Sequence, residues 1–283
     1  MALRDFSKDT SALALNTATL GHNLEGFGAG WPVERTIDAC AERGFAGITF
    51  WRREIGTRAA EIGERVRAAG MAVTGLCRTP YLTGAEAPAS LDEARASVDM
   101  AAALGTDVLT IVTGGTEPGT KGVAETQKIL AERVATLADY ARDRGVNLAL
   151  EPLNPMFGGN RTCIFTARDA LAVCDAVGAD NVGVAIDVYH VWWDLTLAET
   201  LARAGGRVFG FHLCDWLENT TDMLLDRGMM GDGVADLRAI RTAVEGAGYQ
   251  GTCEVEIFSA RDWWQRDPGE VLDVIVERFQ TVC

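Results

Sequence analysis

Four residues of the types that bind metal ions stand at the ends of four successive apolar segments. Glu151 follows Val-Asn-Leu-Ala-Leu, Asp187 follows Val-Gly-Val-Ala-Ile, His212 follows Val-Phe-Gly-Phe, and Glu256 lies within Cys-Glu-Val-Glu-Ile-Phe. Each apolar segment is typical of a buried strand, and parallel strands bring their C-terminal ends together at one edge. The pattern predicts that the four side chains gather around one ion. An ordinary ion pair at a strand end is the alternative for any single one of them.

The chemistry of this set is that of a hard, oxygen-rich site. Three carboxylates and one imidazole suit Mn²⁺, Mg²⁺ or Co²⁺ better than a structural zinc ion, which favours thiolates and imidazoles. Glu254 is a second candidate for the last ligand, because residues two apart in a strand point to the same side. The position of Glu256 nearer the strand end favours Glu256. We therefore predict a single divalent ion, with Glu256 as its fourth ligand.

Other residues that follow predicted strands could contact a substrate. His190, three residues beyond Asp187, is either a substrate contact or a loop histidine bonded to a nearby carbonyl, and we favour substrate contact. Arg227, in the long segment after His212, could bind a substrate oxygen or be a surface charge. A structural role is the simpler interpretation for His22. It is also the simpler one for most tryptophans after predicted strands, although indole rings stack on sugars. These tryptophans are Trp51, Trp192, Trp193, Trp216, Trp263 and Trp264.

A recurring pattern supplies the elements that must position these residues: an amphipathic segment, then glycine, then a short apolar segment. The glycines at these junctions are Gly44, Gly70, Gly105, Gly145, Gly178, Gly205 with Gly206, and Gly248. Glycine commonly ends a helix in the left-handed conformation, so each junction predicts a helix that leads into a strand. These seven junctions and a first strand within Ser11–Leu20 make eight strands. A last helix is expected at about residues 269–279.

The spacing of apolar residues supports the same architecture. They return at helical intervals in three segments: Val33, Ile37 and Ala41; Leu130, Val134, Leu137 and Ala141; Leu237, Ile240, Val244 and Ala247. The strands are unbroken apolar runs, as in parallel sheets covered on both faces. We predict one (β/α)8 TIM barrel domain over residues 1–283. A doubly wound open sheet is the rival, but no Gly-x-Gly-x-x-Gly opens a helix after the first strand.

Long segments after the ligand-bearing strands are expected to share one face with the site. They cover residues 152–166, 188–196, 214–234 and 258–268. Active sites of TIM barrels lie at this C-terminal face of the strands. The loops should therefore form the walls of a substrate pocket.

Composition limits the classes of function. The chain is 48% hydrophobic and 23% charged, which is typical of a soluble globular protein. A net charge of −14 disfavours a nucleic-acid partner. No apolar run reaches the roughly 18–20 residues of a membrane span. Seven cysteines without a Cys-x-x-Cys pair, and a start without a signal-peptide pattern, predict reduced thiols in a cytoplasmic protein. Association into a homo-oligomer stays open.

With these residues in place, the chain resembles the xylose-isomerase-like TIM barrels, the broad sugar phosphate isomerase/epimerase group. The resemblance covers most of the chain. Its strongest pieces are Glu151-Pro-Leu-Asn-Pro, Asp187-Val-Tyr-His190, Phe211-His212-Leu, Arg227 with Gly231-Asp-Gly233, and Glu254-Val-Glu256-Ile-Phe-Ser. Similarity to ketose 3-epimerases implies that Glu151, Asp187, His212 and Glu256 hold one divalent ion. It also implies that His190 and Arg227 contact the substrate.

The resemblance implies an isomerase or epimerase of a keto-sugar or related polyol. The ion would hold the substrate carbonyl and a neighbouring hydroxyl and would stabilise the enediolate. Glu151 and Glu256, on opposite faces of the substrate, would be the catalytic residues that remove and return the proton. The chain departs from the family at residues 154–157, where another acidic residue is common, and its loop between His212 and Arg227 looks longer. Both departures concern the substrate pocket.

Three alternatives accompany this hypothesis. A dehydratase similar to inosose dehydratases would share the first proton transfer and then expel a β-hydroxyl from a sugar or cyclitol. A phosphodiesterase similar to the DNA-repair endonucleases of this fold would need several histidines, whereas the chain has three. A non-catalytic sugar-binding barrel would have no need of paired glutamates around a metal.

Overall fold

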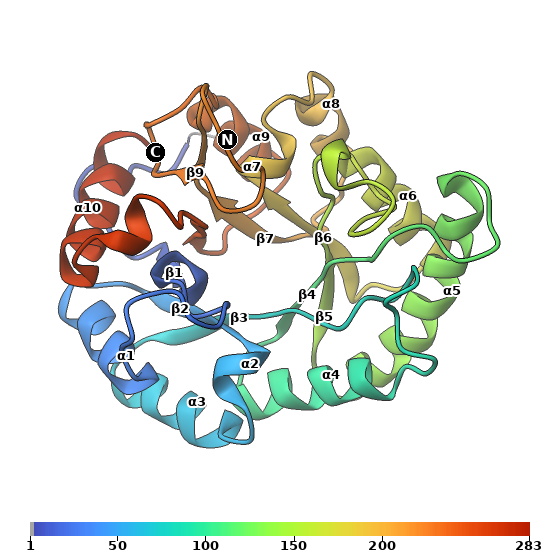
Figure 1. The fold of residues 1–283 in the computed structure, drawn as a ribbon, viewed down its shortest axis with the longest axis horizontal. Coiled ribbons are helices and arrows are strands. Elements are labelled where there is room, and N and C mark those ends of the chain that lie inside the picture. Colours follow the sequence, from blue (N-terminus) through green and yellow to red (C-terminus); the bar gives the residue numbers. More distant parts are fainter. Residues whose placement is uncertain (1–2) are drawn as a thin grey trace.

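The computed structural model describes residues 3–283, and it contains a closed ring of parallel strands surrounded by helices (Figure 1). The barrel strands are β1 (Leu13–Asn16), β2 (Gly47–Trp51), β3 (Ala72–Cys77), β4 (Val108–Ile111), β5 (Asn147–Leu150), β6 (Val182–Asp187), β7 (Val208–Leu213) and β10 (Cys253–Val255). They pair in the order β1-β10-β7-β6-β5-β4-β3-β2, and β1 also pairs with β2, which closes the ring. The fold is the predicted (β/α)8 TIM barrel.

The outer layer consists of helices that follow the strands. They are α1 (Val33–Glu42), α3 (Ala59–Ala68), α4 (Asp92–Leu104), α5 (Val123–Arg142), α6 (Ala167–Val177), α8 (Leu197–Leu201), α9 (Leu237–Gly246) and α10 (Pro268–Thr281). Two single-turn helices, α2 (Arg52–Ile55) and α7 (Val188–Val191), begin directly after β2 and β6. In α5 the predicted apolar face, Leu130 to Ala141, is fully buried against the barrel. Helical spacing therefore identified the packing face correctly.

The junction glycines also have the predicted conformation. Every one of them has a positive φ, from 63° at Gly205 to 96° at Gly248. A side chain is strained in that region, whereas glycine reverses the chain from a helix into the next strand without a steric penalty. Sequence therefore located the helix-to-strand turns.

The first strand is shorter than the segment predicted to contain it. Strand β1 ends at Asn16, and residues Thr17–Leu20 form the 3-10 helix η1. The Asn16 side chain accepts a hydrogen bond from the Ala18 backbone N–H at 3.0 Å, which caps this turn. The side-chain cap overrides the apolar pattern, and it places Asn16 at the mouth of the barrel.

The long segments after the ligand-bearing strands carry small elements of their own. They hold η2 (Pro155–Phe157), α7, the antiparallel pair β8 (Asp215–Trp216) and β9 (Arg227–Gly228), and η3 (Trp263–Gln265). Pairing of β8 with β9 fixes the position of Arg227, which sequence had placed only in a loop. All seven cysteines are buried and free. Within residues 3–283, no helix combines the length and apolarity needed to cross a membrane.

Candidate metal centre and active site

The structure brings the four predicted metal ligands together at the C-terminal ends of the strands. Asp187 ends β6, His212 lies in β7, and Glu151 and Glu256 follow β5 and β10. The backbone N–H groups of Glu151 and Glu256 donate to Ile111 and Leu213, so both residues continue the barrel ladder. One ligand atom from each of the four residues lies within 4.8 Å of the others. The side chains can therefore share one ion.

His212 presents one ring nitrogen to the cluster and the other to its far side. Nδ1 lies 2.9 Å from Oε1 of Glu151 and 3.8 Å from Oε2 of Glu256. Nε2 lies 3.7 Å from Oε1 of Glu254. A metal-binding histidine usually directs its second nitrogen at a carboxylate, which orients the ring. Nδ1 therefore faces the other predicted ligands, and Glu254 lies on the far side of the ring.

Glu254 belongs to a deeper layer than Glu256. Asn16 Nδ2 donates to Oε1 of Glu254 at 2.7 Å, and Thr49 Oγ1 donates to its Oε2 at 2.5 Å. Both oxygens of Glu254 are thus occupied by protein donors. Asn16 Nδ2 also lies 3.0 Å from Oε1 of Glu256, so the same amide steadies both glutamates. This arrangement supports Glu256 as the ligand and gives Glu254 a supporting role.

Arg227 is buried between two of the ligand carboxylates. Its Nη1 donates to Oδ2 of Asp187 at 2.8 Å and lies 3.3 Å from Oε2 of Glu256. Its Nε is buried, with no hydrogen-bond partner among residues 3–283. An unpaired buried donor is costly, so this nitrogen is available to a substrate oxygen. The structure therefore adds an ion pair with Asp187 to the predicted substrate contact.

His190 lies beside the cluster with a defined tautomer. The Asn154 backbone N–H donates to Nδ1 at 3.2 Å, which favours the tautomer with its proton on Nε2; Nε2 lies 3.5 Å from Nη2 of Arg227 and 3.7 Å from Oδ2 of Asp187. Burial lowers the pKa of His190 to about 4 and outweighs the nearby carboxylates. His190 is a neutral hydrogen-bond donor at pH 7. The His190 ring accepts a backbone N–H, so the alternative prediction of a bond from the ring to a nearby carbonyl is not supported.

The electrostatics of the cluster suit a bound cation. Burial raises the pKa of Glu256 to about 8, and Glu151 and Asp187 add to the rise against the pull of Arg227 and His212. Burial opposes the charged form of His212, but Glu254, Glu151 and Glu256 hold its pKa well above its ordinary value. Protons thus compensate part of the buried negative charge in the ion-free protein. A divalent cation can take their place, so this donor set fits a metal ion.

Asp187 is the fixed anion of the site. Burial alone would raise its pKa, but Arg227 and the two neighbouring histidines lower it to about 2. Its Oδ1 accepts a hydrogen bond from the Tyr189 backbone N–H at 2.8 Å. One carboxylate thus caps α7, pairs with Arg227 and faces the cluster.

A small inner cavity opens beside these residues. It measures about 60 Å³, and its walls include Glu151, Glu256, His190 and Arg227. Asp187 and His212 are not among its lining residues. The two glutamates therefore face the space where a substrate would bind, while the other two predicted ligands lie behind them.

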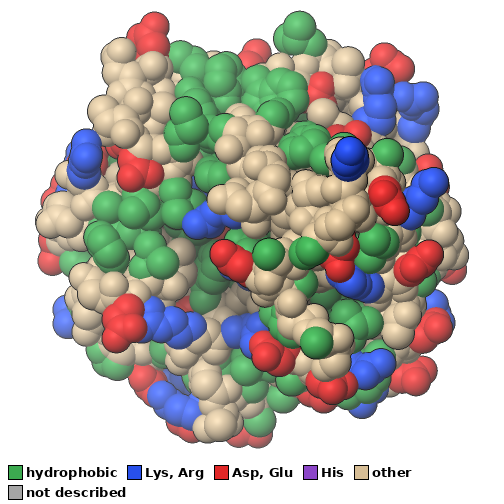
Figure 2. Space-filling model, turned by 45° about the vertical axis from the view of Figure 1, so that its right-hand side comes forward, with side chains coloured by type: hydrophobic (Ala, Val, Ile, Leu, Met, Phe, Trp, Pro, Cys, Tyr) green, Lys and Arg blue, Asp and Glu red, His purple; other side chains and the backbone are tan. Residues whose placement is uncertain are grey.

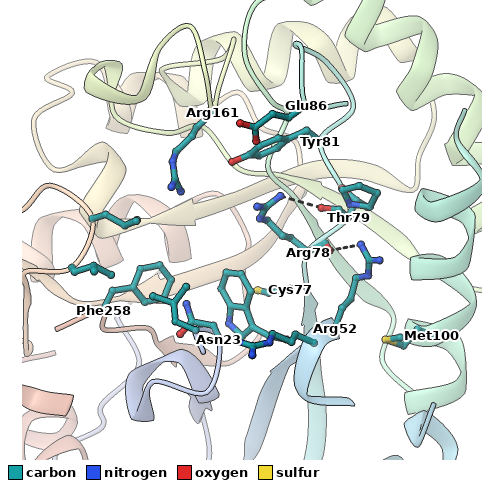
Figure 3. A pocket seen from close by; sticks show the side chains of 16 residues that line it. Asn23, Arg52, Cys77, Arg78, Thr79, Tyr81, Glu86, Met100, Arg161 and Phe258 are labelled. Atoms are coloured by element: carbon teal, nitrogen blue, oxygen red, sulfur yellow. Dashed lines mark hydrogen bonds between the residues drawn. The ribbon is translucent and has the colours of Figure 1, made fainter. Parts of the chain in front are cut away.

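A larger chamber of about 620 Å³ lies outside the inner cavity (Figure 3). The two spaces share wall residues Trp51, Arg78, Tyr81, Arg161, Leu224 and Phe258. Of these, sequence had singled out only Trp51, as a strand-end tryptophan. The position of Trp51 and Asn16 at the ends of the first two strands was a usable signal, and Trp51 Nε1 donates to Oδ1 of Asn16 at 2.8 Å. Arg78 and Arg161 carried no such signal.

The remaining aromatic and histidine candidates lie mainly in structural positions. His22 pairs with Glu54, with Nδ1 3.2 Å from Oε2. Trp263 and Trp264 are buried, and Trp264 Nε1 donates to the Ala18 and Ile257 carbonyls. Trp192 and Trp216 stack near Tyr189. Trp51 differs from them, because it forms a wall of both cavities.

One similar solved structure covers nearly the whole chain, and the similar curated proteins cover about half of it. A crystal structure of a protein from Sinorhizobium meliloti 1021 superposes with a TM-score of 0.89 at 42% identity, over 97% of this chain and 99% of that one. An inosose isomerase of Bacillus velezensis is 33% identical over 138 residues, 47% of this chain and 48% of the relative. An L-ribulose 3-epimerase of Methylomonas sp. is 29% identical over 125 residues, 44% of this chain and 40% of the relative.

The matched regions of these two curated relatives amount to about half of their length or less. The family assignment has a wider basis, because the sequence model described as a xylose isomerase-like TIM barrel matches residues 37–275. That range contains the four predicted ligands, His190 and Arg227. The chain belongs to the xylose isomerase-like TIM barrel family.

Proposed function

We propose that this chain is a divalent-metal-dependent isomerase or epimerase of a keto-sugar or related cyclitol. One observation carries the proposal: Glu151 and Glu256 line the inner cavity and also lie within reach of a common ion with Asp187 and His212. Paired carboxylates beside a substrate space suit proton removal and return at a carbon next to a carbonyl. The named activities of the relatives support the same class of reaction.

In the proposed reaction, the two glutamates exchange a proton with the substrate. One carboxylate removes the proton from the carbon next to the carbonyl, and the other returns a proton to the opposite face or to the adjacent carbon. Glu256, like Glu151, lines the inner cavity, so each carboxylate can take up or deliver a proton there. Asn16 holds Oε1 of Glu256 and leaves Oε2 on the side of His212 and Arg227.

Neighbouring residues orient the substrate. His190 offers its Nε2 proton to a substrate oxygen, since its Nδ1 already accepts the Asn154 N–H. Arg227 Nε, without a partner among residues 3–283, offers a second donor. The residues predicted to hold the ion are Glu151, Asp187, His212 and Glu256. When bound, Mn²⁺, Mg²⁺ or Co²⁺ would polarise the carbonyl and stabilise negative charge on its oxygen.

The test separates isomer exchange from water loss. Purified protein is incubated with each metal in turn, in deuterium oxide, with a panel of ketoses and inososes, and products are followed by NMR. An isomerase or epimerase incorporates deuterium at the carbon next to the carbonyl and yields an isomer of unchanged mass apart from that label. Loss of water from an inosose would identify the dehydratase alternative. Absence of deuterium incorporation in every substrate with every metal would overturn the proposal.

A further inference from the structure

The inner cavity is too small for a whole sugar. A volume of about 60 Å³ has space for only a few water molecules. The atoms at the reacting carbons can occupy it, and the rest of the substrate must extend into the outer chamber of about 620 Å³. The outer chamber would therefore contact the part of the substrate that lies distant from the reacting carbons.

Arginine side chains dominate the charge of the outer chamber. Its lining includes Arg52, Arg53, Arg78 and Arg161, with Glu86 as its one carboxylate among the described residues. In Figure 3, Arg161 reaches into the space from one wall, and Arg78 reaches toward it from another. Over the whole chain, in contrast, acidic residues outnumber Lys and Arg by 40 to 26. The chamber lining therefore carries net positive charge, whereas the protein as a whole is acidic.

Three of these arginines have no carboxylate partner. Within residues 3–283, no ion pair is formed by Arg52, Arg78 or Arg161, whereas Arg53 pairs with Glu25 at 3.0 Å. Arg52 Nη1 lies 3.4 Å from the Arg78 carbonyl, Arg78 stacks on Tyr81 at 4.3 Å, and Arg161 lies 5.9 Å from the Phe157 ring. All three side chains are half-buried. Arg78 also donates from Nη1 to the Thr79 carbonyl at 3.3 Å, but guanidinium groups without a carboxylate partner keep further N–H donors for an anion.

The backbone of Arg161 is held by hydrogen bonds, although its side chain forms no ion pair among the described residues. Its N–H donates to the Phe157 carbonyl at 3.1 Å, and its own carbonyl accepts from Gly114 at 3.1 Å. Thr79, next to Arg78, donates its N–H to the Thr110 carbonyl at 3.3 Å. The two arginines therefore project from anchored segments, which reduces the entropy lost when they bind a ligand.

We propose that the outer chamber binds an anionic group, a carboxylate or a phosphate, on the part of the substrate distant from the reacting carbon. This inference rests on the proposed function and narrows its substrate class. Guanidinium groups bind both anions through paired N–H donors. A net charge of −14 would otherwise repel an anionic substrate, so a local basic lining is needed to hold one. Figure 2 shows acidic and basic side chains interspersed over one face, with some Lys and Arg side chains near its centre.

A matched series of ketoses tests this inference directly. Fructose, fructuronate and fructose 6-phosphate share one carbon skeleton and differ at the last carbon, which is a hydroxymethyl, a carboxylate or a phosphate ester. Calorimetric titration of metal-loaded protein should give at least one anionic ligand about tenfold tighter binding than fructose. The tighter of the two anions identifies the group that the chamber prefers. Equal affinities, or no binding of any member, would overturn the inference.

Variants separate the chamber from direct binding of the anion by the metal. Arg161→Gln and Arg78→Gln should each reduce the preference for the anionic ligand over fructose by about tenfold. Arg203→Gln is the matched control, because Arg203 is exposed in the turn after α8, is not in the chamber lining, and pairs with Glu199 at 3.3 Å. If the arginine variants keep the wild-type preference, the chamber is not the anion site.

The titrations and the deuterium assay together distinguish the anion site from the proposed isomerase activity. A preference for the anion that depends on Arg78 and Arg161, without deuterium exchange in any substrate, would retain the anion site and reject the isomerase. Deuterium exchange together with equal affinity for neutral and anionic ketoses would retain the isomerase and reject the anion site.

Discussion

The inner cluster and the outer chamber are built on opposite principles. Glu151, Asp187, His212 and Glu256 are at most 6% exposed, sit at strand ends, and are held by neighbouring polar groups. Of the four arginines of the chamber, three are half-buried and Arg53 is exposed. All four lie beyond the strands, and three of them form no ion pair among the described residues. Bond making requires fixed atoms, whereas recognition of a variable group tolerates mobile ones. The difference agrees with the two proposals, which give the chemistry to the cluster and the selectivity to the chamber.

The largest expected effect comes from the inner cluster. Glu151→Gln keeps the shape of the side chain but removes a proton acceptor, so we expect kcat to fall about a thousandfold. The melting temperature should stay close to that of the wild type. Measurement of turnover, metal content and thermal unfolding checks this prediction. Glu218→Gln, an exposed residue of the loop after β8, is the control. Normal turnover by Glu151→Gln would remove the inner cluster from the chemistry.

An intermediate effect is expected from the layer beneath the cluster. Glu254→Gln weakens the orientation of His212, and loss of such a supporting group typically lowers metal affinity about 10- to 100-fold. Turnover at saturating metal should be largely retained, because Glu254 does not line the inner cavity. Metal titration followed by an assay at excess metal measures both quantities. A variant with wild-type affinity that is inactive at every metal concentration would make Glu254 a participant in catalysis.

Acidity should affect the inner cluster through its bound protons. The pKa of Glu256 is about 8 and that of His212 is raised above its ordinary value, so both groups carry protons at neutral pH in the ion-free protein. Metal binding must displace these protons. Affinity should therefore rise with pH, about tenfold per unit for each displaced proton, as long as these groups still carry protons. Titrations from pH 6 to pH 9 measure this slope. A pH-independent affinity would mean that no proton is displaced.

The smallest effect is expected where the two regions meet. Trp51→Phe keeps an aromatic wall but removes the 2.8 Å hydrogen bond to Asn16, which in turn holds Glu256. Loss of one such bond, about 1 kcal/mol, corresponds to about a fivefold fall in kcat/KM. Trp193→Phe, which removes a bond to the His190 backbone carbonyl, is a comparison at a second tryptophan. A change in anion preference without a change in kcat would place Trp51 with the chamber.

Much of the site was predictable because its residues are tied to strand ends. The apolar runs before Glu151, Asp187 and His212 fixed both their strands and their common edge, and the junction glycines all have the expected positive φ. Asn16 was not predicted, because a side-chain hydrogen bond ended β1 inside an apolar segment. Local polar capping of this kind leaves no periodic signal.

The sequence by itself determined the barrel, and it predicted the face and the four side chains that the structure brings together, because alternating helices and buried strands leave few ways to pack. The tertiary structure added the reason why Glu254 stands apart from the cluster, because Asn16 and Thr49 donate to both of its carboxylate oxygens. It also brought Arg78 and Arg161, 83 residues apart, to one cavity. Loop conformation depends on long-range packing and hydrogen bonds, so the lining of the substrate chamber could not be derived from local pattern.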